Sequence, residues 1–272
     1  MKKAVYQLNQ IPSEAKIRKH LKKIVFGSNI HCPVCRTRKI TTKSERYWCS
    51  RCRRKFSLLS HTWLFHLKLP LQTFWFVLWC WTQQIPVKQT SRLTHLSQTT
   101  IYHWFDIFRS KLPKDQDLLE SLVQLDEAYF GGRGKDTMRA LFMGKQIDSR
   151  KLAYKIQTTF PVREDAWDFL RNNIAPETQI ATDGAKIYRG MEKWWPVTHS
   201  YDIHRKFEFI QTSQIEGIFG TLRTFIRRMY HHVTCDKLPG LVHEFCCRFS
   251  HPEMFESPYQ YLLITLRLAP IS

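Results

Sequence analysis

The chain has 272 residues, of which 43% are apolar and 14% aromatic, and its formal net charge is +19. The apolar content can fill a core, which excludes a mainly disordered chain, and the length suits one large domain with one or two small modules. So large a positive excess favours a polyanionic partner, most commonly nucleic acid. The plainer alternative is a solvated basic surface without a partner.

The first thirty residues are predicted to form a basic helical segment. Ile17, Leu21 and Ile24 recur at helical spacing, with lysines and arginines around them. Met1 is followed by two lysines but by no apolar run, so no secretory signal is expected.

Two close cysteine pairs are the strongest motif. Cys32 and Cys35 are followed, after thirteen intervening residues, by Cys49 and Cys52. Thiolates at this spacing face one point, and two such pairs offer the tetrahedral four-thiolate set that suits zinc. Paired cysteines also favour a metal in a reducing compartment over a disulfide framework. We predict a zinc ribbon over residues 31–57 with a structural Zn2+, since four thiolates leave no open coordination position.

The ribbon is expected to contain a short hairpin with a basic surface. Trp48 and Phe56 are predicted to supply its small apolar core. His31 could substitute for a thiolate, but an incidental position is the better interpretation. The candidate DNA phosphate contacts are Arg51, Arg53, Arg54 and Lys55.

A stretch rich in Trp and Phe covers residues 69–87. Glutamines, threonines and Pro86 interrupt it, so it is too polar to span a bilayer, and no membrane partner is expected. We predict a buried helix over residues 71–84, within a helical DNA-binding segment over residues 68–112.

A helix-turn-helix is predicted in the second half of that segment. Val87–Leu93 and Ser97–Arg109 read as helices joined by a three-residue turn, and Ser97 is a natural N-cap. An ordinary helical hairpin is the alternative. The side chains expected to face a DNA groove are Gln98, Thr99, Thr100 and His103.

Residues 118–250 change to short β-rich runs with polar breaks, which predicts a mixed α/β domain. The predicted strands cover residues 122–130, 140–147, 152–160, 179–182 and 197–203. The predicted helices cover residues 164–172 and 212–249, the latter broken near residues 231–239. Residues 251–272 are expected to be a C-terminal tail.

Three acidic residues stand apart from the rest. Asp126 lies inside an apolar β-like run, where a carboxylate is costly unless it is paired or holds a metal. Asp183 ends a second predicted strand, and Gly184 lets the chain turn there. Glu216 lies on a predicted amphipathic helix. The alternative for any one acid is a surface ion pair, and we assign that role to Glu127, which could also be an accessory ligand.

The helix of Glu216 carries basic residues on the same face. Arg223 and Arg227 follow Glu216 at helical spacing, so Arg223 could bind a phosphate beside the carboxylates and Arg227 could contact DNA. Two strand carboxylates and one helix carboxylate can hold two Mg2+ or Mn2+ ions, which prefer oxygen ligands and catalyse phosphodiester chemistry.

Together these motifs resemble the insertion-sequence transposases that carry an N-terminal zinc ribbon and a DDE-type catalytic domain, the bacterial relatives of the Merlin transposons. The resemblance covers roughly residues 15–250. Besides the cysteine pairs, its motifs are Leu125–Gly132, Ala181–Gly184 with Tyr188, Ile215–Arg223, and Tyr230–Val233 with Leu238, Glu244, Phe245 and Arg248.

The resemblance implies a ribonuclease H-like fold in which Asp126, Asp183 and Glu216 match the metal-binding triad. One departure concerns the stretch before the Glu216 helix. Many members have Asn-His there, whereas this chain has Ile203 before His204. An Asn-based variant of the site is therefore absent, which favours Glu216 as third ligand or indicates an impaired copy. His204, His231 and His232 could contact DNA or the site.

The expected function is recognition of terminal inverted repeats, strand cleavage and strand transfer into target DNA. A homo-oligomer on paired double-stranded DNA ends, in the bacterial cytoplasm at the nucleoid, is implied by the resemblance. The alternatives are a non-catalytic DNA-binding regulator derived from a transposase and a structure-selective nuclease on the same fold.

Overall fold

The structure is a computed structural model that describes residues 11–116, 118–131, 138–158, 160–201, 213–231 and 233–266. Two compact units make up the chain, one of residues 1–111 with 253–272 and one of residues 112–252. None of the helices in the described ranges has the length and apolar character that a membrane crossing requires.

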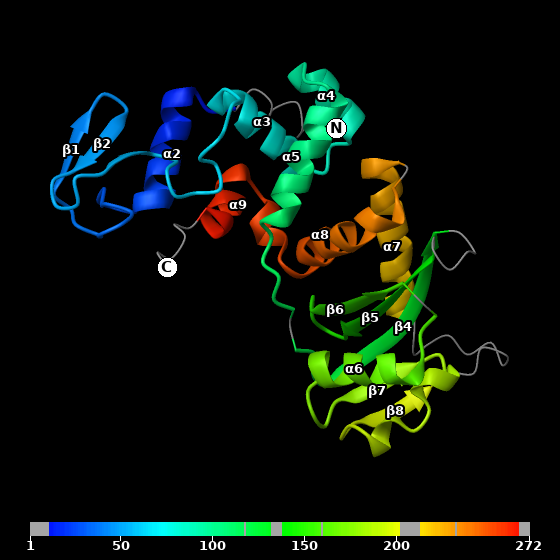
Figure 1. The fold of residues 1–272 in the computed structure, drawn as a ribbon. Helices are drawn as coiled ribbons and strands as arrows, with labels where there is room; N and C mark the ends of the chain where they lie inside the picture. Colours follow the sequence, from blue (N-terminus) through cyan, green and yellow to red (C-terminus); the bar gives the residue numbers. More distant parts are fainter. Residues whose placement is uncertain are drawn as a thin grey trace. The chain divides into compact units, whose positions relative to one another are not determined.

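The first unit combines a helical core with a small sheet (Figure 1). Its helices are α2 (Glu14–Phe26), α3 (Leu71–Thr82), α4 (Val87–Thr94), α5 (Gln98–Ser110) and α9 (Pro258–Thr265), which follows the short 3-10 turn Pro252–Phe255. The predicted helices over 71–84, 87–93 and 97–109 are thereby confirmed within one or two residues.

Aromatic side chains form the centre of this helical core. The fully buried Trp81 of α3 packs against Phe108 of α5 and Tyr261 of α9, with ring centroids 5.5 and 5.2 Å away. The Tyr261 hydroxyl donates a hydrogen bond to the Phe108 carbonyl at 2.7 Å. The segment expected as a C-terminal tail thus contributes a packed helix to the first unit.

The small sheet of the first unit holds the cysteine pairs. Its antiparallel strands are β1 (Ile40–Lys43), β2 (Arg46–Cys49) and β3 (Lys55–Ser57), in that order. Tyr47 packs against Phe56, and both rings contact Phe26 of α2. The prediction that Trp48 fills this core is wrong, since 37% of its surface is exposed. Side chains alternate along a strand, so Tyr47 faces inward and Trp48 outward.

The second unit is built on a five-stranded mixed sheet. Its strands are β4 (Leu122–Gly131), β5 (Met138–Gln146), β6 (Leu152–Gln157), β7 (Gln179–Thr182) and β8 (Thr198–Tyr201), in the spatial order β6-β5-β4-β7-β8. The first three strands form an antiparallel meander, whereas β7 pairs parallel with β4 and β8 pairs parallel with β7. This mixed topology is the ribonuclease H-like arrangement expected from the resemblance.

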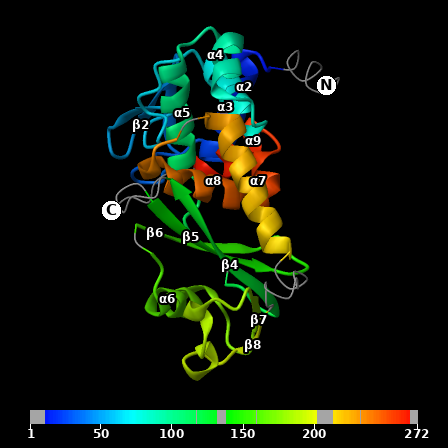
Figure 2. The same cartoon turned by 90° about the vertical axis from the view of Figure 1, so that its right-hand side faces the viewer.

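Helices cover both faces of this sheet (Figures 1 and 2). They are α6 (Arg163–Asn173), α7 (Ser213–Tyr230) and α8 (Leu238–Ser250), with 3-10 turns at Lys186–Tyr188, Met191–Lys193 and Cys235–Lys237. Val123 and Leu125 of β4 share a core with Phe169 of α6. Gln124 and Asp126 alternate with these two residues along β4, so their side chains leave the other face of the sheet, where Gln124 contacts α7.

A buried polar network joins α7 to α8. Glu244 is fully buried, and its carboxylate accepts hydrogen bonds from the Tyr230 hydroxyl at 2.8 Å and the Arg248 Nε at 2.9 Å. A buried carboxylate is tolerated because both of its oxygens have partners. Glu244, named by the resemblance without a role, therefore joins α8 to Tyr230 of α7, and Arg248 one turn along α8 balances its charge.

Replacing Glu244 by Ala should lower the free energy of unfolding by about 3–5 kcal/mol, because it removes the buried carboxylate that the Tyr230 hydroxyl and the Arg248 guanidinium contact. Chemical denaturation measures the change. The matched control is Asp236→Ala, since Asp236 pairs with Arg139 while its side chain is 89% exposed. That variant should differ from wild type by less than about 1 kcal/mol. Equal changes in the free energy of unfolding of the two variants would show that the buried contacts of Glu244 do not stabilise the fold.

Candidate functional site

The four cysteines of the ribbon converge on one point. All four sulfur atoms lie within 4.8 Å of one another, and no disulfide joins them. The Cys32 and Cys52 sulfurs are 3.5 Å apart, as are those of Cys35 and Cys49. A tetrahedron with Zn–S bonds of about 2.3 Å has edges of roughly 3.8 Å, so this set fits zinc.

The backbone around the cysteines favours thiolates. The backbone N–H of Val34 points at the Cys32 sulfur, and that of Cys52 points at the Cys49 sulfur, each at 3.4 Å. Desolvation raises the pKa of Cys52, and hydrogen bonds with the neighbouring thiols raise it further, whereas at Cys49 hydrogen bonds from the Cys52 backbone and the neighbouring thiols outweigh desolvation and lower the pKa, because the close sulfurs compete for the same protons. The ribbon is therefore a four-thiolate zinc site, and His31 instead contacts Arg36 and the Asn29 carbonyl.

The sheet register brings two of the predicted carboxylates together. In the parallel pair of β4 and β7, Gln124 lies beside Ala181. Asp126 lies two residues beyond Gln124 on β4, and Asp183 two residues beyond Ala181, just after β7; the charge of Asp183 acts on Asp126. Neighbouring strands are about 4.8 Å apart, so the two side chains leave the same face of the sheet as neighbours. Asp183 comes directly after β7, where Gly184 turns the chain with a positive φ of 75°.

Helix α7 brings the third carboxylate to the same face. The side-chain oxygen of Gln124 accepts a hydrogen bond from the backbone N–H of Ile215 at 2.9 Å, which fixes the start of α7 on β4. Glu216 follows on the first turn, with an exposed side chain. Ile218 and Leu222 belong to the buried stripe of α7, which packs into the second unit. Glu216 lies beside this stripe on the helix surface, where its side chain is exposed.

The titration of Asp126 reports this convergence. Burial, and to a smaller extent the charges of Glu127, Asp183 and Glu216, together raise the pKa of Asp126 to about 7, against a hydrogen bond from the Glu127 backbone N–H that lowers it. The three predicted carboxylates thus lie in one another's electrostatic field. They are less tightly gathered than the thiolates: among the described residues, the four cysteines form the one group whose donor atoms all lie within 4.8 Å.

Glu127 departs from the surface role expected for it. It is half-buried on the opposite face of β4 from Asp126, and its carboxylate accepts a hydrogen bond of 2.5 Å from the fully buried Tyr188 hydroxyl. Burial raises the pKa of Glu127, and the nearby Asp183 raises it too. The sequence contains both residues, but only the fold shows that Glu127 and Tyr188 tie β4 to the turn after β7.

The outer face of α7 is open and basic. Glu216, Gly220, Arg223 and Arg227 are all exposed, and a side chain built at Gly220 would meet nothing within 4 Å. The Arg223 guanidinium lies 5.5 Å from the ring centre of Phe130, two pleats beyond Asp126 on β4. This contact holds Arg223 on the face that carries the carboxylates.

The predicted DNA contacts of the first unit are mostly exposed. Gln98, Thr99 and His103 lie on the solvent side of α5, at and near its N-terminus. Ser97 caps that helix by accepting a hydrogen bond from the Thr100 backbone N–H at 3.1 Å, and the Thr100 hydroxyl lies 2.9 Å from the Ser97 hydroxyl. Thr100 therefore serves the cap. The contacts predicted on the ribbon are exposed as well: Arg51, Arg53, Arg54 and Lys55. Ile203, His204 and His232 lie outside the described residues.

Replacing Asp126 by Asn should stabilise the zinc-loaded protein without Mg2+ or Mn2+ at pH 8. Because the pKa of Asp126 rises from its ordinary 3.8 to about 7 on folding, the folded chain holds a proton that the unfolded chain has released between these values. The free energy of unfolding of the wild type therefore falls as pH rises through this window. The gain in Asp126→Asn should be on the order of 2–4 kcal/mol at pH 8 and vanish near pH 4.

Denaturation of the zinc-loaded protein without added Mg2+ or Mn2+, across this pH range, measures the difference. Asp168→Asn is the control, since Asp168 is an exposed acid on α6 whose loss should change stability little at any pH. A gain in Asp126→Asn that did not depend on pH would show that burial of the charge is not its cause.

Two protein families match the chain. Residues 118–250 match the ISXO2-like transposase domain, and residues 12–55 match the transposase zinc-ribbon domain. No curated protein sequence matches the chain.

Several solved structures are distantly similar. A simian T-cell lymphotropic virus intasome, in complex with the PP2A regulatory subunit B56 gamma, is 13% identical with a TM-score of 0.38, over 72% of this chain and 76% of that chain. The HTLV-2 integrase catalytic core domain, in complex with magnesium, is 12% identical with a TM-score of 0.33, over 49% of this chain and 87% of that chain. Scores this low add nothing to the fold assignment, which rests on the strand order and directions.

Proposed function

The chain belongs to the insertion-sequence transposases that pair an N-terminal zinc ribbon with a DDE-type catalytic domain, and on this premise we propose that it cuts the ends of its mobile element and joins them to target DNA. The observation that supports the proposal is that half-buried Asp126 of β4 feels the charges of Asp183, which follows β7, and of Glu216, on the first turn of α7.

The proposed catalytic residues are Asp126, Asp183 and Glu216. Their oxygen donors are the kind that Mg2+ or Mn2+ prefers, and the raised pKa of Asp126 is a reason for this site to attract a cation. When bound, the metal ions polarise the scissile phosphate and activate the attacking oxygen. Water attack on the phosphodiester at the element end would release the 3′-hydroxyl of the element and leave the phosphate on the 5′ end of the flanking strand. This 3′-hydroxyl would then attack a target phosphodiester, joining the element to the target phosphate and releasing the 3′-hydroxyl of the target strand.

Basic side chains around the triad would hold the DNA. Arg223, fixed over Phe130, is suited to a backbone phosphate next to the reacting one, and Arg227 extends the same exposed face by one turn. In the first unit, Gln98, Thr99 and His103 would read the terminal repeat. Two or more copies on paired ends, acting in the cytoplasm on the bacterial chromosome, complete the proposal.

Strand transfer on DNA ends taken from the flanks of its own gene tests this function. The wild type with Mg2+ should give joined products, whereas Asp183→Ala should bind the same DNA and give none. Equal activity of the two proteins would show that the three carboxylates are not required for the reaction. Binding by the wild type without any cleavage would support a regulator instead, and nicks without joined products would support a nuclease.

A further inference from the structure

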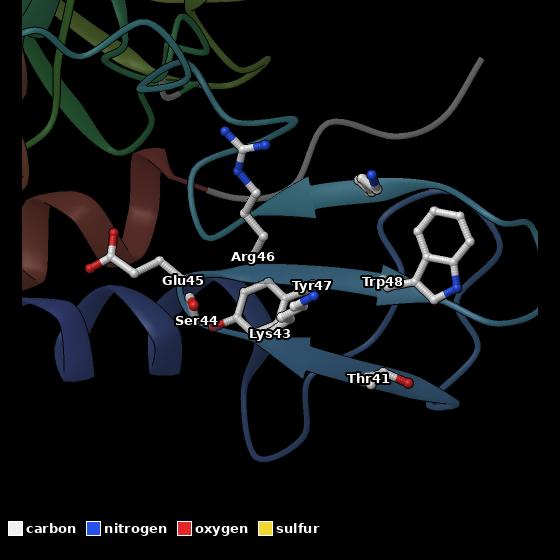
Figure 3. Close-up of a pocket in the computed structure, with 8 residues that line it drawn as sticks. Thr41, Lys43, Ser44, Glu45, Arg46, Tyr47 and Trp48 are labelled. Carbon is white, nitrogen blue, oxygen red and sulfur yellow. The ribbon is translucent and has the colours of Figure 1, made fainter.

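The outer face of the zinc ribbon presents one exposed aromatic ring among cations (Figure 3). In the antiparallel register, Thr41 lies opposite Trp48, and Trp48 lies opposite Lys55, so these three side chains form a row across the sheet. Lys43 and Arg46 form the next row on the same face, two residues away along their strands. The zinc-side face, with Tyr47 and Phe56, is the buried one.

The charge of this face is unbalanced. Lys43, Arg46 and Lys55 are exposed, and the Lys55 ammonium lies 5.8 Å from the ring centre of Trp48. The one acid at this edge is Glu45, whose carboxylate pairs with Arg18 of α2 at 3.3 Å. Three cations around an exposed indole are therefore available to a polyanion.

The face is also hollowed. The side chains around Trp48 line a depression with a volume of about 840 Å³, within the range of pockets that hold small ligands. A duplex would offer this depression only its backbone, because stacking covers the faces of paired bases. An unpaired base can stack on an exposed ring while nearby cations hold its phosphates.

We propose that this ribbon face, made of Thr41, Lys43, Arg46, Trp48 and Lys55, binds unpaired nucleotides of DNA, with one base stacked on Trp48. The inference rests on the proposed action on DNA ends, where cleavage exposes single strands. It gives the ribbon a role in addition to duplex contacts: it holds the strand that the catalytic unit has separated or cut.

Fluorescence anisotropy with the full zinc-loaded chain tests the proposal. The two probes are a blunt duplex of the element end and the same duplex with a single-stranded thymidine overhang, both without added Mg2+ or Mn2+. Trp48→Ala should weaken overhang binding by roughly tenfold or more and change blunt binding by less than about twofold, since each stacked base contributes strongly to affinity. Trp48→Phe should recover most of the loss because it keeps a ring.

The cations have a separate readout. Lys43→Gln and Arg46→Gln should each lower the slope of log affinity against log salt for the overhang by roughly 0.7, the value for one phosphate contact on a single strand. Trp194→Ala is the matched control, since it removes a tryptophan that is 53% exposed and belongs to the second unit. It should leave both probes unchanged.

Two outcomes would overturn the proposal: an unchanged affinity of Trp48→Ala for the overhang, or an equal loss on both probes, which would mean that the face meets duplex DNA. Zinc content of one ion per chain confirms that each variant keeps its ribbon. The binding assay contains no Mg2+ or Mn2+, so a negative result in it would say nothing against strand transfer. Conversely, a chain that binds the overhang but shows no strand transfer would agree with the proposed role of the ribbon face.

Discussion

Glu216→Gln should lose strand cleavage and strand transfer by roughly a thousandfold, because removing a ligand charge costs several kcal/mol of transition-state stabilisation and each 1.4 kcal/mol or so is a factor of ten. The substitution keeps the size of the side chain, and Glu216 is exposed on the first turn of α7, so the fold should not change. Affinity for the element end should stay within about twofold, since phosphate contacts by Lys and Arg dominate it. Single-turnover assays with Mg2+ measure the chemistry, and anisotropy measures the binding.

The control for this variant is Glu164→Gln. Glu164 is also an exposed acid on the first turn of a helix, but α6 lies on the opposite face of the sheet. It should retain wild-type activity. A Glu216→Gln protein as active as Glu164→Gln would mean that the third ligand lies elsewhere, while Asp126 and Asp183 would keep their positions in the site.

Cys49→Ser should abolish zinc binding and unfold the ribbon. Structural zinc contributes on the order of 10–16 kcal/mol of apparent binding free energy to small zinc modules, far more than the few apolar side chains packed here can replace. The ribbon core outside the metal consists of Tyr47, Phe56 and the contact with Phe26. Without zinc the backbone of residues 36–55 should unfold, so that trypsin can cut after the arginines and lysines of this segment.

Metal analysis and limited trypsin digestion followed by mass spectrometry check this result. The wild type should hold one zinc ion per chain and resist cleavage within the ribbon. Cys235→Ser makes the same chemical change at a cysteine outside the metal cluster and should behave as wild type. A zinc-free Cys49→Ser protein that still resisted trypsin would show that the ribbon folds without its metal.

Local sequence patterns predicted most secondary structure because each pattern reflects a local physical requirement. The apolar β-like run of residues 122–130 predicted β4, and Ser97 as an N-cap predicted the start of α5, each within one or two residues. The cysteine spacing predicted the zinc ligands because a knuckle is a local structure. Elements whose pattern was weak, such as α9, were missed because the packing of Tyr261 and Leu262 against distant helices decides them.

Trp48 and Glu127 show where local reading failed. Both choices depend on which face of a strand is covered, and a strand pattern identifies two faces without saying which one meets a partner. Contacts with α2 turned Tyr47 inward and left Trp48 outside. Packing against Tyr188, sixty-one positions away in the chain, made Glu127 part of the interior instead of a surface acid.

By itself, the sequence determined the zinc site, the order of the modules, the helices and strands with strong periodicity, and the identity of three unusual acids. Which acids lie near one another depends on contacts between distant segments. The parallel pairing of β4 with β7 leads toward Asp126 and Asp183, the hydrogen bond from Ile215 to Gln124 starts α7 on β4, and the charges of Asp183 and Glu216 both act on Asp126. The physical reason is that these contacts join residues about sixty to ninety positions apart, whose meeting depends on the sheet order and the burial of whole faces, which no short stretch of sequence specifies.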